Sequence, residues 1–114
     1  MHELSIAMSL VDLAREEAER VQGRVIALHI KVGRLSGVFK DALLSSYEMA
    51  SYDTSLQGSQ LIIEDVPIVI YCSQCRAESA VVSMQWLCCS VCSAPSSRIL
   101  SGKELELVSL EMES

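Results

Sequence analysis

Residues 72–92 read CSQCRAESAVVSMQWLCCSVC, and two CxxC pairs in this stretch decide how this part of the chain can fold. The pairs are Cys72–Cys75 and Cys89–Cys92, separated by residues 76–88. Each CxxC turn can supply two thiolates to one ion, and four thiolates complete the tetrahedron that zinc prefers. Four thiolates leave no open coordination position, which is typical of a structural site. The pattern therefore predicts a zinc-ribbon-like module that gains its folding energy from the metal.

Three other uses of these cysteines compete with zinc. Two disulfides would need an oxidising compartment, and the same four thiolates could instead hold an iron–sulfur cluster. A thioredoxin-like redox pair would place one CxxC at a helix start within a βαβ unit, and the sequence lacks that pattern. The fifth cysteine, Cys88, would turn the second pair into CxxxC if it replaced Cys89 as a ligand. We therefore expect Cys88 to be a partly buried free thiol.

Regular hydrophobic patterns lie on both sides of the cysteine-bearing segment. Apolar residues at three- and four-residue intervals predict amphipathic helices, and alternation with a period of two predicts strands. The expected elements are helices over residues 4–21 and 39–51, and strands over residues 24–33, 60–70 and the chain after Gly102. Pro67 should place its strand at an edge or break it. The expected fold class is α+β, a small β-sheet covered by two helices, with the four-cysteine module inserted before the last strand.

Composition excludes several functional classes. The 114 residues are 50% hydrophobic and 21% charged, as in an ordinary globular domain, and the formal net charge is −6. This excess of acid, with 4% aromatic residues, argues against nucleic acid or an anionic membrane as the main partner. We expect a cytoplasmic protein, because no secretory signal or membrane-spanning segment is apparent. Phosphate-loop, GxSxG and HExxH motifs are absent, so we do not expect an enzyme.

The first three residues, Met1, His2 and Glu3, offer a second kind of metal site. The α-amine of Met1 and the amide and imidazole nitrogens of His2 can close fused chelate rings around one ion. The amide of Glu3 can add a fourth nitrogen, and square-planar nitrogen coordination suits Ni(II) or Cu(II). From the residues alone, a solvated histidine and an acidic residue favoured by the helix dipole explain the same sequence.

Several motifs together resemble those of the HypA/HybF family. They are the opening MHELS, the VGRLSG turn at residues 32–37, the two CxxC pairs and a late G-x-E-L strand at residues 102–105. This family consists of nickel chaperones for the maturation of nickel–iron (NiFe) hydrogenases, and the resemblance covers essentially the whole chain. It implies a site for transported Ni(II) at Met1, His2 and Glu3. It also implies a structural Zn(II) site at Cys72, Cys75, Cys89 and Cys92.

The position of the cysteine-bearing segment between the patterned segments predicts two domains, and the resemblance implies the partners. Residues 1–70 and 102–114 would form the nickel-binding domain, and residues 71–101 the zinc-binding domain. The GTPase HypB would exchange nickel with this chain, and the immature hydrogenase large subunit would receive it; some relatives also serve urease. A homodimer is compatible with the sequence. The alternative function is a zinc-ribbon module that binds a protein or a nucleic acid.

The second CxxC pair departs from the family's usual CPxCG pattern. Ser90 stands where the family has proline, and Ser93 stands where it has glycine. Glycine adopts a positive φ at little cost, so we expect Ser93 to strain or loosen this turn.

Overall fold

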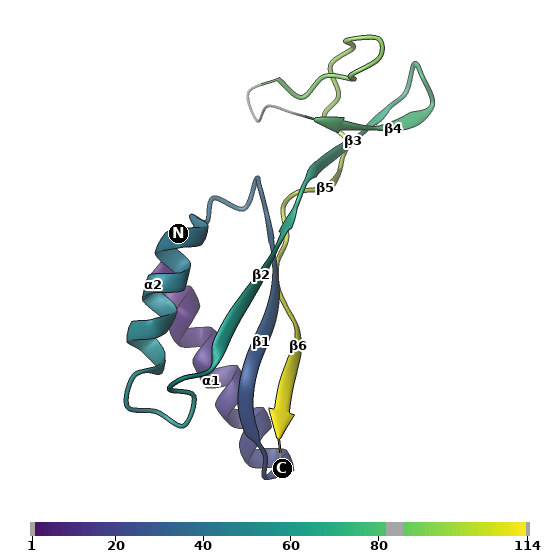
Figure 1. Ribbon diagram of the computed structural model, residues 1–114. Coiled ribbons are helices and arrows are strands. Elements are labelled where there is room, and N and C mark those ends of the chain that lie inside the picture. Colours follow the sequence, from purple (N-terminus) through teal and green to yellow (C-terminus); the bar gives the residue numbers. More distant parts are fainter. Residues whose placement is uncertain (1, 82–85, 114) are drawn as a thin grey trace. The chain divides into compact units, whose positions relative to one another are not determined.

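The computed structural model describes residues 2–81 and 86–113 (Figure 1). Its elements are α1 (Glu3–Val21), β1 (Arg24–Gly33), α2 (Lys40–Ser51), β2 (Gln60–Val66), β3 (Ile68–Cys72), β4 (Ala77–Val81), β5 (Ile99–Ser101) and β6 (Leu105–Glu113). They form two three-stranded sheets, ordered β2-β1-β6 and β4-β3-β5. In the described part of the chain, no helix is both long and apolar enough to cross a membrane.

The chain divides into two compact units. The first consists of Met1–Lys31, Val38–Glu64 and Glu106–Ser114, and the second of Val32–Gly37 and Asp65–Leu105. These bounds follow from packing within the chain, whereas the expected division at residues 71–101 was drawn around the metal ligands. The division into nickel-binding and zinc-binding domains stays a prediction.

The first unit packs α1 and α2 together on one side of the β2-β1-β6 sheet (Figure 1). Both helices begin and end within one residue of the predicted bounds, because their apolar residues follow the helical period. The buried residues of α1 are Ala7, Leu10, Val11 and Ala14, and those of α2 are Leu43, Tyr47 and Ser51. On β1, Leu28 and Ile30 are buried, and so are Val25 and Ala27, whereas Ile26 is 41% exposed. The burial along β1 therefore departs from the strict alternation of a strand that is covered on one face.

The second unit contains the β4-β3-β5 sheet, in which β3 pairs antiparallel with both neighbours. Its core is small: Ile68, Ile70 and Val81 are buried, and Leu35, Leu87 and Ile99 pack against them. The predicted strand over residues 60–70 is divided at Pro67 into β2 and β3, as expected.

Residues 76–88, between the CxxC pairs, have the composition of strands, and the sequence predicts a hairpin there. The described part of this segment pairs differently. The pairing partner of β4 is β3, with Cys72 opposite Ala77, so the hairpin encloses the first CxxC turn instead. Residues 82–85 lie outside the described part of the chain. Composition identified β4 as strand-forming, but strand pairing is decided by contacts that local composition does not encode.

Close backbone contact explains the glycine that opens the VGRLSG turn. The N–H of Gly33 donates to the carbonyl of Glu104 at 2.7 Å, and that of Leu35 donates to the carbonyl of Gly102 at 2.6 Å. A Cβ at position 33 would lie 2.1 Å from the Gly102 carbonyl oxygen. Only glycine therefore fits at position 33.

We expect Gly33→Ala to lower the free energy of unfolding by about 3 kcal/mol, because its methyl group would overlap the backbone at Gly102. Gly23→Ala is the matched control, since a Cβ at position 23 meets no atom nearer than 3.4 Å. Urea denaturation followed by circular dichroism measures both variants. Equal stability of Gly33→Ala and the wild type would contradict the close approach.

Candidate functional site

The four cysteines of the CxxC pairs come together in the second unit. Their Sγ atoms all lie within 4.8 Å of one another; the Cys72–Cys92 pair is 3.5 Å apart and the Cys75–Cys89 pair 3.9 Å. Four sulfurs that each lie about 2.3 Å from a central zinc ion are about 3.8 Å apart in a tetrahedron. The observed spacing fits one such ion and leaves no room for a cluster of iron and sulfide ions.

Each CxxC turn directs a backbone N–H at the sulfur of its first cysteine. In the first turn the N–H of Cys75 donates to Cys72 Sγ at 3.4 Å, and in the second the N–H of Val91 donates to Cys89 Sγ at 3.4 Å. The residue after each second cysteine is left-handed, with φ of 52° at Arg76 and 62° at Ser93. Such a conformation costs a residue with a side chain about 1–2 kcal/mol. The strain expected at Ser93 is therefore present.

A hydrogen bond accounts for the serine in place of proline in the second turn. The N–H of Ser90 donates to Ser79 Oγ at 2.8 Å, and the two hydroxyl oxygens are also 2.8 Å apart. Ser79 is buried on β4. Proline at position 90 would lack the donor, so this departure from the family pattern ties β4 to the second turn.

Residues after the second CxxC turn form hydrogen bonds with β3, the strand that ends at Cys72. Ser96 Oγ donates to the carbonyl of Tyr71 at 2.6 Å, and the Tyr71 N–H donates to the carbonyl of Arg98 at 3.0 Å. The guanidinium of Arg98 also lies 4.9 Å from the centre of the Tyr71 ring. These contacts hold the second CxxC pair next to the first.

The thiols differ in how strongly they hold a proton. The pKa of Cys89 is lowered to about 6, because the backbone N–H groups of Cys92 and Val91 stabilise its thiolate. The pKa of Cys75 is raised to about 12, mainly because its thiol hydrogen-bonds to the sulfur of Cys92 and then to that of Cys72. A metal ion that binds all four sulfurs must therefore displace protons.

Cys88 lies outside the group of four sulfurs. It is partly buried, and its backbone forms an isolated bridge with Pro95. All five cysteines are free thiols, which agrees with the prediction for Cys88 and leaves no disulfide in the structure.

The residues of the expected N-terminal site lie in the first unit, although Met1 itself is outside the described residues. His2 is exposed, precedes α1 with φ −86° and ψ 120°, and its side chain makes no capping hydrogen bond. The first turn of α1 closes when the N–H of Ile6 donates to the His2 carbonyl at 3.2 Å. The N–H groups of His2 and Glu3 precede this first hydrogen bond, so they take no part in the hydrogen bonds within α1.

Glu3 has a second role that the sequence did not reveal. Its carboxylate accepts a hydrogen bond of 3.3 Å from the N–H of Phe39, which directly precedes α2. Glu3 and Phe39 are 36 positions apart, and Ser79 and Ser90 are 11 apart. Neither contact leaves a local pattern in the sequence, which is why both supporting pairs escaped prediction.

The chain is similar to known proteins over nearly its whole length. A family model described as "Hydrogenase/urease nickel incorporation, metallochaperone, hypA" matches residues 1–112. The chain is 45% identical over 114 residues to hydrogenase maturation factor HypA of Roseiflexus sp. (strain RS-1), covering 99% of this chain and 93% of the relative. Identity to the HypA of Chloroflexus aurantiacus (strain ATCC 29366 / DSM 635 / J-10-fl) is 44% over 112 residues, 97% of this chain and 98% of that one.

Solved structures are similar as well. The solution structure of the Ni metallochaperone HypA from Helicobacter pylori matches with a TM-score of 0.64 and 26% identity, covering 98% of this chain and 97% of that one. A second structure, titled "Solution structure of HypA protein", matches with a TM-score of 0.72 and 26% identity, covering 99% and 97%.

We expect Ser93→Gly to stabilise the metal-loaded protein by about 0.5–1 kcal/mol, because glycine relieves the left-handed strain but loses more chain entropy on folding. Ser93→Ala is the matched control, since it removes the hydroxyl and keeps the Cβ. Urea denaturation of the zinc-loaded variants measures the difference. A gain for Ser93→Ala equal to that for Ser93→Gly would rule out backbone strain as the cause.

Proposed function

The chain belongs to the HypA family of hydrogenase and urease nickel-incorporation metallochaperones, and on this premise we propose that it binds Ni(II) and delivers it to an immature NiFe hydrogenase. The observation that carries the proposal is the exposed His2 at the start of α1, beside backbone amides that the helix does not use. Such a chain end binds and releases an ion without any catalytic step.

The proposed nickel site uses nitrogen ligands. They are the α-amine of Met1, the amide and imidazole nitrogens of His2 and the amide nitrogen of Glu3. An amide nitrogen that binds nickel in a square plane has lost its proton, and the positive end of the α1 dipole favours the resulting negative charge. The carboxylate of Glu3, held by the Phe39 N–H, fixes the first turn of α1 below the site.

An exposed site also suits transfer of the ion. A docking acceptor can replace the nitrogen ligands one at a time, because no other element of the first unit needs to open. The α-amine has an ordinary pKa of about 7.7–8.0, and only its deprotonated form binds nickel. Nickel affinity should therefore fall as the pH is lowered through this range.

The second proposed site is structural. The thiolates of Cys72, Cys75, Cys89 and Cys92 fit Zn(II), which would supply a permanent cross-link between the two CxxC turns. We propose that residues 71–101 act as the zinc-binding domain and residues 1–70 with 102–114 as the nickel-binding domain. Among the described residues of the second unit, the hydrophobic cluster has a buried centre of three side chains, so we propose that binding energy from zinc supplies much of the unit's stability.

The proposed partners follow from the family. The family description names nickel incorporation into hydrogenase and urease, which implies partners in enzyme maturation. We propose the GTPase HypB as the protein that exchanges nickel with this chain, the immature hydrogenase large subunit as its acceptor, and the cytoplasm as the place of transfer. A homodimer is the oligomer that we propose to test first.

We expect His2→Ala to weaken Ni(II) binding at least tenfold, because the imidazole and its chelate ring are lost. Isothermal titration of zinc-loaded protein with Ni(II) measures affinity and stoichiometry. The chain's other histidine provides the matched control: His29 lies on β1 with Nε2 3.4 Å from a carboxylate oxygen of Glu111, so His29→Ala should bind nickel normally. Wild-type affinity and stoichiometry in His2→Ala would remove the proposal.

We expect zinc removal by a chelator at neutral pH to unfold the β4-β3-β5 sheet, because β3 ends at the ligand Cys72, β4 begins two residues after Cys75 and the core is small. Amide resonances of residues 65–105 should collapse, whereas those of α1 and α2 should persist. Heteronuclear NMR before and after chelation makes the comparison. An unchanged spectrum of the second unit would show that zinc is not structural.

A further inference from the structure

We propose that the outer edge of β6 is a docking site for an extended segment of a partner protein, in which apolar residues alternate with lysine or arginine. This proposal concerns a surface of the first unit and does not rest on nickel binding.

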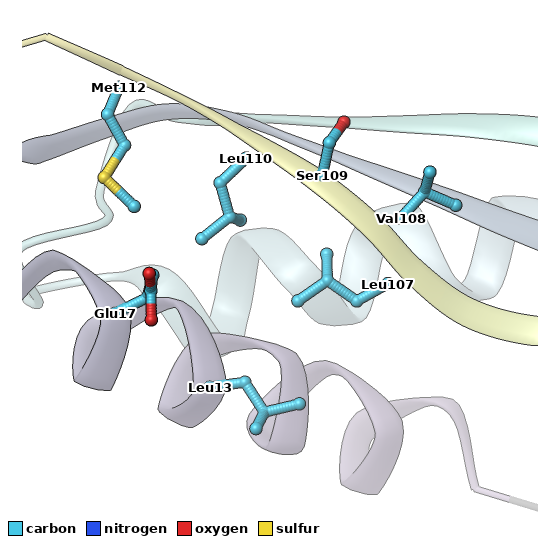
Figure 2. A pocket seen from close by; sticks show the side chains of 7 residues that line it. All are labelled: Leu13, Glu17, Leu107, Val108, Ser109, Leu110 and Met112. Atoms are coloured by element: carbon cyan, nitrogen blue, oxygen red, sulfur yellow. The ribbon is translucent and has the colours of Figure 1, made fainter.

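An apolar groove runs beside this edge. A cavity of about 420 Å³ is lined by Leu13 and Glu17 of α1 and by residues 107–110 and Met112 of β6. Figure 2 shows Leu107, Leu110 and Met112 on the side of β6 that faces α1, with Val108 and Ser109 on the other side. Leu13 and Val108 are each more than half exposed. Apolar side chains of an added strand could pack in this groove.

The edge itself can accept a strand. In the order β2-β1-β6, β6 pairs with β1 alone, and among the described residues no strand covers its other side. Its nine residues, LELVSLEME, contain no lysine or proline, and its charged side chains are all glutamates, which oppose pairing with an acidic strand but not with a basic one. About half of the backbone N–H and C=O groups of an edge strand point away from its neighbour, and those of β6 would provide the main-chain hydrogen bonds of β-augmentation.

A second copy of the chain is a poor occupant of this edge. Two β6 strands can pair antiparallel with Leu107 of one copy opposite Leu110 of the other. The same register places Glu106 of one copy opposite Glu111 of the other. Like charges directly opposite each other destabilise a strand pair. Self-pairing in the register that matches the apolar faces is therefore opposed by charge.

The same register indicates which side chains a partner strand needs opposite β6. Glu111 already lies 3.4 Å from His29, and Glu17 pairs with Arg20 on its own helix, whereas Glu106 has no ion pair within the described chain. A partner strand with lysine or arginine opposite Glu106 gains an attractive cross-strand pair where a second copy would add repulsion. Apolar residues between its basic residues would face the groove.

The experiment uses the zinc-loaded full chain and three labelled nine-residue peptides as probes: KVKVKVKVK, EVEVEVEVE and KVKVPVKVK. Fluorescence anisotropy measures their binding, and heteronuclear NMR locates it. We expect the basic peptide to bind at least tenfold more tightly than the acidic one, with shift changes concentrated at residues 106–112. The proline-containing peptide should bind more weakly than its parent, because proline lacks a main-chain donor.

Two substitutions test the named residues. Glu106→Lys and Leu13→Asp should each lower affinity for the basic peptide at least fivefold. Glu19→Lys makes the same charge change as Glu106→Lys on a face of α1 turned away from Leu13 and Glu17, so it should leave the affinity unchanged. Glu106→Lys would also place a lysine opposite Glu111 of a second copy, and should therefore promote dimers in sedimentation experiments.

Three results would overturn the proposal. They are equal or absent binding of the basic and acidic peptides, shift changes outside β6 and α1, and an equal loss of affinity in Glu19→Lys. A wild-type dimer whose contacts map to the β6 amides would instead make a second copy the occupant, which also contradicts the proposal.

Discussion

Convergence of four cysteine sulfurs on one centre is the feature on which the proposed stability of the second unit depends. In its described part the hydrophobic cluster has three buried side chains, and β5 contributes three residues to the sheet. The sulfurs nevertheless lie at the spacing of a zinc tetrahedron, with backbone N–H groups pointing at Cys72 and Cys89. A metal ion can therefore provide the cross-link that so small a core lacks.

The two proposed metal sites offer different ligands, which would keep two metals apart in one short chain. The cysteine group presents only sulfur and, once filled, has no open position through which the ion could be passed on. In the proposed nickel site, nitrogen ligands would lie at the start of α1 beside the exposed His2, which would suit Ni(II) and permit stepwise release. A chain that delivers one ion and keeps another needs this difference in both chemistry and accessibility.

Local patterns in the sequence predicted most of the elements and the cysteine group. The alternation in residues 24–33 predicted β1 with the bounds observed, Pro67 separated β2 from β3, and CxxC spacing identified four sulfurs that the fold brings together. Pairing of β4 with β3 and the Glu3–Phe39 contact were missed, because both join segments whose sequences carry no sign of each other. The two serines of the second turn show the difference. The strain at Ser93 was predictable from the φ that the turn requires, whereas the hydrogen bond between Ser90 and Ser79 was not predictable.

X-ray absorption spectroscopy at the zinc and nickel edges of one nickel-loaded sample tests the division between the two sites most directly. We expect zinc bound by four sulfur atoms and unchanged by nickel, and nickel bound by nitrogen or oxygen without sulfur. Sulfur in the coordination shell of nickel, or loss of sulfur from that of zinc when nickel is added, would contradict two separate sites.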